Sequence, residues 1–292
     1  SSASMTIRSF ELLRPASLPE ASELLIKHGE ESRLIAGGTT LVTLMKQRAL
    51  YYPYLVDLQS VPDLDRISVE NGWVRIGAMA THRTIERSPA IKQSLPVLAQ
   101  AVGKVGNVRV RETATLGGNL AHGDSRLDPP PALFVLGADL VLFGPHGNRT
   151  VPIREFYRGM YDSALEPGEI LTEIKIPPMA ENSRAVYIRY NSLSANDWPC
   201  LGVAVFLVRT GDRCRELRIA LSGLAGTPLL IRGLDFVKDQ ILTSSLMDDV
   251  VRVVDEQISP QSDLRGSEWY KRQVAGVFIK RAAIEVERKF FS

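Results

Sequence analysis

The 292-residue chain has few of the side chains that hold metal clusters or cross-link a fold, since it contains two cysteines and four histidines. Cys200 and Cys214 cannot by themselves ligate an iron–sulfur cluster or a Cys-type zinc site. The histidines show no ligand spacing such as His-Glu-x-x-His, so we expect them to be structural or solvated. We expect the two thiols to be reduced, as is usual in a cytosolic protein.

The sequence also lacks a strong net charge and long apolar runs. Its formal net charge of +2 implies no strong field for nucleic acid or for a membrane surface. The longest apolar stretch, PALFVLGADLVLF (131–143), is broken by Gly137 and Asp139 and is too short to cross a bilayer. No charged segment followed by an apolar one opens the chain, so we expect no signal peptide and a cytoplasmic location.

The patterns that are present predict an α+β fold. A chain of this length usually forms two or three packed units, because a single hydrophobic core seldom grows so large. Ser17 and Gly29 are of the types that begin and end a helix, and Asn71-Gly72 is a favoured hairpin turn. The pattern breaks at Pro177-Pro178, where we place a linker to a smaller portion of strands and helices, including an amphipathic helix from Ser267.

Two glycine pairs carry the clearest functional signal. The first lies in LIAGGTTLVTLMK (34–46), where Gly37-Gly38 stands between an expected strand and an expected helix. Glycine leaves the backbone N–H groups accessible, and a helix that starts at Thr39 or Thr40 would offer a site for an anion. The alternative is a plain tight turn with a threonine cap, and a single glycine pair taken alone favours this alternative. The stretch matches neither the P-loop nor the Rossmann fingerprint.

The second pair, Gly117-Gly118, lies in TATLGGNLAHGD (113–124), within a polar stretch from Gly106 to about Asp128 that we interpret as a long loop. Two such loops suit a ligand with two phosphates held from two sides. Polar residues here could bond ribityl, ribose or ring edges: Asn119, His122, Asp124 and Asp128. The alternative is a surface loop rich in turn formers, although long loops in compact domains are usually functional. Arg109 and Arg111 would contact phosphate or a partner, or are solvated.

The two loops, in this order and at this separation, resemble those of the FAD-binding, or medium, subunits of the molybdenum hydroxylases, and most of all their carbon monoxide dehydrogenase branch. Further segments share the resemblance: FELLRPASLPEASELL, YLVDL, VRIGAMATH, ALEPGEILTEIKIP and SDLRGSEWYKRQVAGVFIKRA. The resemblance implies a two-lobed FAD-binding domain of the vanillyl-alcohol-oxidase (PCMH) type over residues 1–178, with lobes of about 1–58 and 59–178. A smaller α+β C-terminal domain of the CO dehydrogenase flavoprotein type would occupy residues 179–292.

The resemblance also implies which residues would hold FAD. The two loops contribute Ala36, Gly37, Gly38, Thr39, Thr40, Leu41, Thr115, Leu116, Gly117, Gly118 and Asn119. Asp128 corresponds to the family's acidic residue after the second loop. Trp198, which follows Asp197, would lie beside the flavin ring; the alternative for it is a core tryptophan. Because neither loop core contains a histidine to form a tether, we expect the FAD to be noncovalent.

The activity implied by the resemblance is electron transfer. A large molybdenum subunit oxidises a small substrate, and electrons pass through [2Fe–2S] centres of a small subunit to FAD on this chain and then to an external acceptor. No catalytic acid, base or nucleophile is expected here, because the cofactor carries the chemistry. The assembly would be a dimer of heterotrimers. Two alternatives are a stand-alone FAD oxidoreductase of the same fold and a nucleotide-binding module without turnover.

Overall fold

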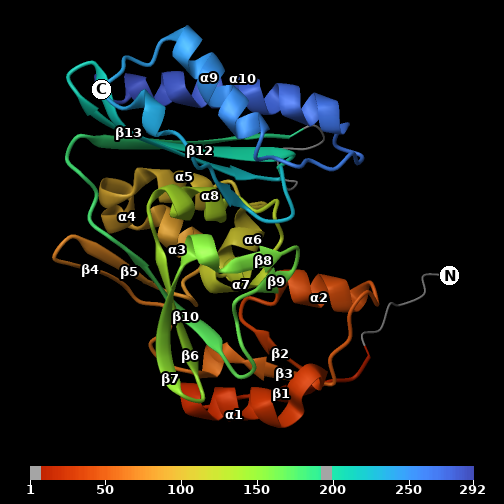
Figure 1. The fold of residues 1–292 in the computed structure, drawn as a ribbon. Helices are drawn as coiled ribbons and strands as arrows, with labels where there is room; N and C mark the ends of the chain where they lie inside the picture. Colours follow the sequence, from red (N-terminus) through yellow and green to blue (C-terminus); the bar gives the residue numbers. More distant parts are fainter. Residues whose placement is uncertain (1–7, 192–198) are drawn as a thin grey trace.

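The N-terminal part of the chain is a small parallel sheet with the strand order β1-β3-β2. The structure, a computed structural model, describes residues 8–191 and 199–292. Helix α1 packs beside this sheet (Figure 1), beginning after Ser17, whose hydroxyl accepts the Glu20 N–H, and ending at Gly29 with a φ of 52°. The elements are β1 (Glu11–Leu13), α1 (Leu18–His28), β2 (Ser32–Ile35), α2 (Thr39–Lys46) and β3 (Tyr54–Asp57).

A five-stranded antiparallel sheet follows, with the order β4-β5-β10-β6-β7. Asn71 and Gly72 join its first two strands with φ values of 52° and 80°, so the predicted hairpin turn is confirmed, because a type I′ turn needs two positive φ angles. The strands are β4 (Ile67–Glu70), β5 (Trp73–Gly77), β6 (Asp139–Gly144), β7 (Gly147–Pro152) and β10 (Ile170–Ile176). A short hairpin precedes the last of these, β8 (Tyr157–Gly159) with β9 (Asp162–Ser163).

Six short helices lie between this sheet and the sheet of the C-terminal part (Figure 1). They are α3 (His82–Arg87), α4 (Pro89–Ser94), α5 (Pro96–Val102), α6 (Val108–Thr113), α7 (Leu116–His122) and α8 (Pro129–Val135). The prediction of a long loop from Gly106 to Asp128 was therefore wrong. Side chains cap both helices in that stretch: Asn107 accepts the Val110 N–H at 3.1 Å and Thr115 accepts the Gly118 N–H at 3.0 Å. The glycines concealed α7, because glycine has a low helix propensity that tertiary packing can override.

The C-terminal part is an antiparallel sheet with the order β11-β12-β13-β14, covered on its outer face by α9 and α10 (Figure 1). The elements are β11 (Ser183–Tyr190), β12 (Leu201–Thr210), β13 (Arg213–Ser222), β14 (Leu229–Leu230), α9 (Ser244–Asp255) and α10 (Glu268–Arg288). The predicted helix after Ser267 is confirmed, and the Ser267 hydroxyl caps it by accepting the Tyr270 N–H. Within residues 8–191 and 199–292, no helix combines the length and the apolarity that a bilayer crossing requires.

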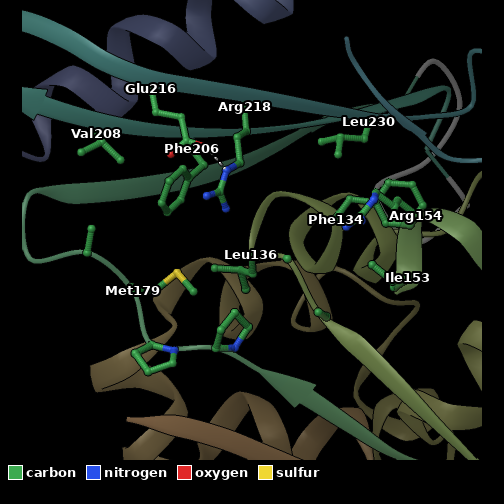
Figure 2. Close-up of a pocket in the computed structure, with 15 residues that line it drawn as sticks. Phe134, Leu136, Ile153, Arg154, Met179, Phe206, Val208, Glu216, Arg218 and Leu230 are labelled. Carbon is green, nitrogen blue, oxygen red and sulfur yellow. Dashed lines mark hydrogen bonds and ion pairs between the residues drawn. The ribbon is translucent and has the colours of Figure 1, made fainter. Parts of the chain in front are cut away.

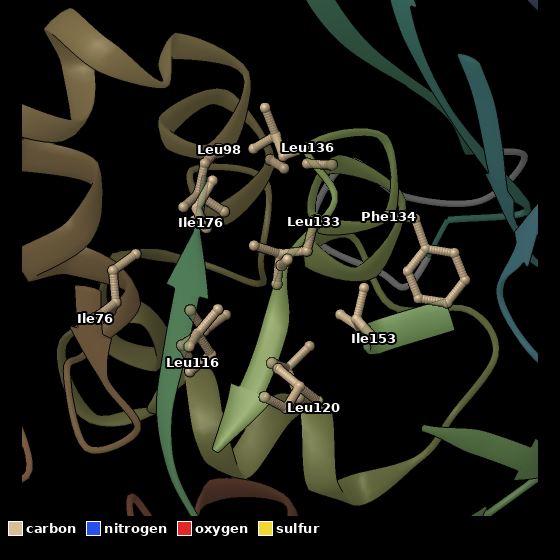
Figure 3. Packing of buried hydrophobic residues seen from close by; sticks show 14 of the residues in the cluster. Ile76, Leu98, Leu116, Leu120, Leu133, Phe134, Leu136, Ile153 and Ile176 are labelled. Atoms are coloured by element: carbon tan, nitrogen blue, oxygen red, sulfur yellow. The ribbon is translucent and has the colours of Figure 1, made fainter. Parts of the chain in front are cut away.

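The inner face of the C-terminal sheet shares a hydrophobic core with the N-terminal part. Tyr187, Ala204 and Phe206 of that sheet belong to the same buried cluster as Leu133 and Leu136 around helix α8. Figure 3 shows the centre of this cluster, where side chains from α5, α7 and α8 meet those of strands β5 and β10. Full burial of one leucine or isoleucine contributes about 1.5–3 kcal/mol. The shared core therefore fixes the C-terminal sheet firmly on the helices.

One histidine of this core should make stability depend on pH. His82 is fully buried, and neither ring nitrogen has a hydrogen-bond partner among the described residues. Burial, assisted by the charge of Arg111, lowers the pKa of His82 to about 4. In the unfolded chain the imidazole of His82 binds a proton near pH 6.5, whereas in the folded chain it stays neutral until the pH approaches 4. Stability contributed by neutral His82 is therefore present above pH 6.5 and is lost as the pH falls toward 4.

We expect His82→Leu to remove this loss, which amounts to about 3 kcal/mol between pH 7 and 4 at one proton per molecule. Asp128 titrates in the opposite sense over part of the same range, because burial raises its pKa to about 6, so the quantity to measure is the difference between wild type and variant. Urea unfolding at a series of pH values provides it. The exposed His146 supplies the control variant His146→Leu, and equal pH slopes for wild type and His82→Leu would contradict the assignment.

Candidate functional site

The structure brings the two glycine pairs together, although about eighty residues of sequence separate them. A Cβ placed on Gly37 would lie 2.1 Å from the Thr113 carbonyl oxygen and 2.9 Å from the Ala114 Cα. A Cβ on Gly118 would lie 3.7 Å from the Cβ of Ala36. The turn between β2 and α2 therefore packs against the turn between α6 and α7, and the close approach needs glycine at position 37.

The first turn leads into a helix whose N-terminus has no side-chain cap. Helix α2 begins at Thr39, as predicted, and its N-cap Gly38 adopts the left-handed conformation with a φ of 74°. The Val42 N–H donates to the Gly38 carbonyl at 2.8 Å. N–H groups that precede this bond have no intrahelical acceptor, and the helix dipole makes that end positive. The arrangement suits an anion such as a phosphate.

The second turn contributes differently, because its backbone donors are already used within the protein. The Leu116 N–H donates to Ala80 and the Gly117 N–H to Ala78, at 3.0 and 2.8 Å, while the Gly118 N–H is held by the Thr115 hydroxyl. Leu116 and Gly117 are buried, whereas Gly118 is exposed. A Cβ on Gly117 would lie 2.5 Å from that of Ala78. The second glycine pair thus lets α7 pack closely on Ala78, directly after β5, and places the exposed Gly118 beside Ala36.

Asn119 adds a polar atom that the fold does not satisfy. Its Oδ1 atom is buried and has no hydrogen-bond partner among the described residues. Leaving a buried acceptor unpaired costs about 1–3 kcal/mol. Because Asn119 directly follows the exposed Gly118, a hydroxyl or N–H of a group bound over the glycine pair would recover that cost. Asn119 is therefore suited to bind a ligand that lies along the two turns.

Asp128, the predicted acidic residue of the site, is engaged inside the protein. Its carboxylate is 4% exposed and accepts one bond from the Tyr187 hydroxyl and one from Arg189 Nη1 at 3.0 Å. Burial raises the pKa of Asp128 to about 6, against the opposing effect of Arg189. These contacts connect the start of α8 to strand β11. The predicted Trp198 and its neighbour Asp197 lie outside the described residues.

The two arginines beside the second turn have different environments. Arg111 is a structural residue: its Nε bonds Glu86 at 3.3 Å, and its Nη1 donates to the carbonyls of Val105 and Gly106. Arg109 is exposed. The sequence offered three interpretations for these arginines: a phosphate contact, a partner contact or a solvated side chain. Arg111 has another role in the structure, because its side chain connects Glu86 to the two carbonyls that precede α6.

Two candidates named from the sequence, His122 and Asp124, belong to a cluster at the end of α7 whose other members the sequence did not indicate. Asp124 is fully buried, is paired with Arg126 at 2.8 Å and accepts the Tyr161 hydroxyl at 3.1 Å. The Tyr161 ring also lies 5.3 Å from that of His122, and its φ is 58°. Arg126 holds the pKa of Asp124 below its usual value, although burial acts the other way. No local signal marks Tyr161, since only the hairpin of β8 and β9 brings it to α7.

A separate cavity of about 390 Å³ lies at the junction of the N-terminal helices with the C-terminal sheet. Figure 2 shows Phe206 and Arg218 pointing into it from the sheet, with Leu136 and Met179 on the opposite side. Arg218 stacks 4.4 Å from the Phe206 ring centre, bonds Glu216, and donates to the Val135 carbonyl. None of the predicted site residues that the structure describes lines this cavity, so it is distinct from the glycine turns.

Comparison with known proteins identifies the family of this chain. Residues 8–179 match the family described as FAD binding domain in molybdopterin dehydrogenase, and residues 187–286 match the CO dehydrogenase flavoprotein C-terminal domain. The chain belongs to this FAD-binding family. The carbon monoxide dehydrogenase medium chain of Hydrogenophaga pseudoflava is 35% identical over 277 residues, which cover 94% of this chain and 95% of that protein. The nicotine 6-hydroxylase medium subunit of Paenarthrobacter nicotinovorans is 31% identical, covering 96% and 98%.

Solved structures of the same family have the same fold. Reconstituted CO dehydrogenase from Oligotropha carboxidovorans contains a chain that matches with a TM-score of 0.94 and 34% identity, covering 97% of this chain and 99% of that one. Quinoline 2-oxidoreductase from Pseudomonas putida 86 matches with a TM-score of 0.91 and 29% identity over the same shares. The α+β architecture of an FAD-binding domain followed by a flavoprotein C-terminal domain is thereby confirmed.

Membership of this family makes FAD the cofactor of the chain and makes the chain the flavin-binding component of an oxidoreductase. The residues present fit the cofactor. A dinucleotide carries a pyrophosphate, and the uncapped N-terminus of α2 is suited to such an anion. The orphaned Asn119 oxygen can accept a bond from a ligand hydroxyl or N–H. The FAD that the resemblance implied is confirmed as the cofactor.

Proposed function

We propose that this chain is the electron-transfer subunit of a molybdenum hydroxylase complex. FAD would receive electrons from [2Fe–2S] centres of a small partner subunit and deliver them to an external acceptor, while a molybdenum-bearing large subunit oxidises the substrate. The observation that supports this most is the packing of Gly37 against Thr113 and of Gly118 beside Ala36, which joins two distant segments into one surface. Relatives named as medium chains or subunits of larger enzymes support the partners.

Each predicted site residue has a proposed part in this function. The N–H groups of Thr39, Thr40 and Leu41 bind the pyrophosphate, and Ala36, Gly37 and Gly38 allow its close approach. In the second segment Thr115, Leu116 and Gly117 hold α7 in place, Gly118 forms the contact surface, and Asn119 accepts a bond from the cofactor. Asp128 stays a proposed contact at the boundary with β11, and Trp198 a proposed neighbour of the flavin ring.

We further propose the division of the chain into residues 1–178, with lobes of about 1–58 and 59–178, and residues 179–292. No helix or strand spans the boundary, since β10 ends at Ile176 and β11 begins at Ser183. The assembly would be a dimer of heterotrimers. A cytoplasmic location is supported by Cys200 and Cys214, which are buried and not bridged to each other, as expected in a reducing compartment.

Bound FAD supplies reversible uptake of one or two electrons. The chain's own contribution is to bind and orient the cofactor and to restrict water around it. Apolar contacts from Leu41 and Ala36, both half-buried, would restrict solvent at the first turn.

The test of cofactor binding is direct. We expect the purified chain to carry one FAD without a covalent bond, because neither the first turn nor residues 115–119 contain a histidine or cysteine. Precipitation with trichloroacetic acid should leave the yellow chromophore in the supernatant, where chromatography identifies it as FAD. A pellet that stays yellow would contradict the noncovalent bond, and colourless protein that takes up no added FAD would contradict the site.

A further inference from the structure

Tyr161, in the turn between β8 and β9, has a backbone conformation that tyrosine rarely adopts. Its φ is 58°. The other non-glycine residues with a positive φ, within the part of the chain that the structure describes, are aspartate, asparagine and arginine. Aspartate and asparagine tolerate this region because their side chains are short and polar. A bulky residue here is strained, and such strain persists where the surrounding contacts impose it, often at a ligand site.

Two hydrogen bonds hold Tyr161 in this conformation. Its N–H donates to the Gly123 carbonyl at 2.9 Å, and its hydroxyl donates to Asp124 Oδ2 at 3.1 Å. Although burial opposes it, the bonds from Arg126 keep the pKa of the Asp124 carboxyl below its ordinary value, so the acceptor is ionised. The backbone and the hydroxyl of Tyr161 are thus both fixed, yet 59% of the residue is exposed. The fold therefore holds an aromatic ring rigidly at the surface instead of burying it.

The Tyr161 ring lies beside the helix that carries the second glycine pair (Figure 1). Gly118 and His122 are four residues apart on α7, which places them on one face and about 6 Å apart along the axis. The His122 ring lies 5.3 Å from the Tyr161 ring. Strand β2 follows this face of α7, because Gly118 lies beside Ala36 and the charge of Arg33 adds to burial in lowering the pKa of His122. The face thus leads from the glycine turns to Tyr161.

We propose that the ring of Tyr161 stacks on the isoalloxazine ring of FAD. The inference rests on the proposed FAD site at the two glycine turns. With the pyrophosphate at the N-terminus of α2 and Gly118 as a contact surface, the ribityl chain extends along α7 and brings the isoalloxazine to Tyr161. A phenol that donates to an ionised carboxylate is electron-rich, whereas oxidised isoalloxazine is electron-poor. The stack therefore favours the oxidised over the reduced flavin.

Two variants test the proposal on the full chain with its FAD. Tyr161→Asn removes the ring, and asparagine tolerates the positive φ, whereas Tyr161→Phe keeps the ring and removes only its bond to Asp124. We expect Tyr161→Asn to shift the visible flavin spectrum and to weaken binding of oxidised FAD by about fivefold. If binding of reduced FAD is unchanged, the midpoint potential of the bound flavin rises by about 20 mV, which is the same fivefold change for two electrons. Tyr161→Phe should stay closer to the wild type in all three measurements.

The matched control is Trp73→Asn, which removes an exposed aromatic ring of β5 and should leave the bound flavin unchanged. An unaltered spectrum and potential in Tyr161→Asn would overturn the proposal while FAD stays bound, whereas a wild-type chain that takes up no FAD would overturn the proposed site itself. Equal changes in Tyr161→Asn and Tyr161→Phe would contradict stacking, because Tyr161 would then act only through Asp124. ADP should bind the FAD-free wild type and Tyr161→Asn equally; a fivefold loss of ADP affinity with an unchanged potential would place adenine at Tyr161 and refute the proposal.

Discussion

Gly37→Val should yield a folded chain that has lost most of its FAD. A Cβ at this position would lie 2.1 Å from the Thr113 carbonyl oxygen and 2.8 Å from the carbonyl carbon, and backbone atoms cannot turn aside as a flexible side chain can. The valine therefore forces the two turns apart and separates the N-terminus of α2 from the surface of Gly118. Strain of this kind costs about 1–3 kcal/mol, and a misfit of about 1.4 kcal/mol at the cofactor lowers affinity tenfold.

From the sequence alone, the reason for glycine at these positions is that it keeps the backbone N–H groups accessible to an anion. The structure gives a different reason, because the Cβ of Gly37 points at protein and its φ is not among the positive values. Gly117→Val should act in the same way through Ala78. The control is Gly226→Val, since a Cβ there meets nothing within 4 Å. The measurement is the FAD content per chain, read from the absorbance of the purified protein. Full FAD occupancy in both glycine variants would show that these turns are not part of the site.

Substrate should reduce the flavin rapidly only when the partner subunits are present. In a complex co-expressed with its large and small subunits, a substrate that the complex oxidises should bleach the flavin absorbance. The same compound should reduce the flavin of the isolated chain at least about a hundredfold more slowly, because we expect this chain to supply no catalytic acid, base or nucleophile for substrate oxidation. Stopped-flow absorbance of both preparations measures this difference.

Dithionite provides the control, because it should reduce the flavin of the isolated chain directly and so prove that the cofactor is accessible to electrons. Rapid bleaching of the isolated chain by the substrate would instead establish a stand-alone FAD oxidoreductase of the same fold. A flavin that dithionite reduces but that stays oxidised in the working complex would favour a nucleotide-binding module without turnover. Removal of the small subunit alone should stop substrate-driven bleaching if electrons pass through its [2Fe–2S] centres.

Local features were predicted well from sequence because neighbouring residues decide them. Asn71-Gly72 adopts the positive φ angles that its residue types favour, and Ser17 and Ser267 cap helices where their hydroxyls reach the N–H three residues ahead. The interpretation of residues 106–128 as a long loop was wrong, because long-range contacts decide the structure of that stretch. Helix α7 accommodates Gly117 because Ala78, which follows β5, packs against it, and no residue near Gly117 in the sequence indicates that contact.

The sequence by itself determined the cofactor class and the family, because two glycine pairs in a fixed order and separation are features of the chain that need no coordinates. It also determined where helices begin and hairpins turn. Three contacts were decided only by the tertiary structure. Gly37 packs against the Thr113 carbonyl, and the N–H groups of the second turn donate to the carbonyls of Ala78 and Ala80. Asp128 pairs with Arg189 of β11. The physical reason is one of range: propensity and capping act over three or four residues, whereas close approach and burial depend on segments that meet only in the folded chain.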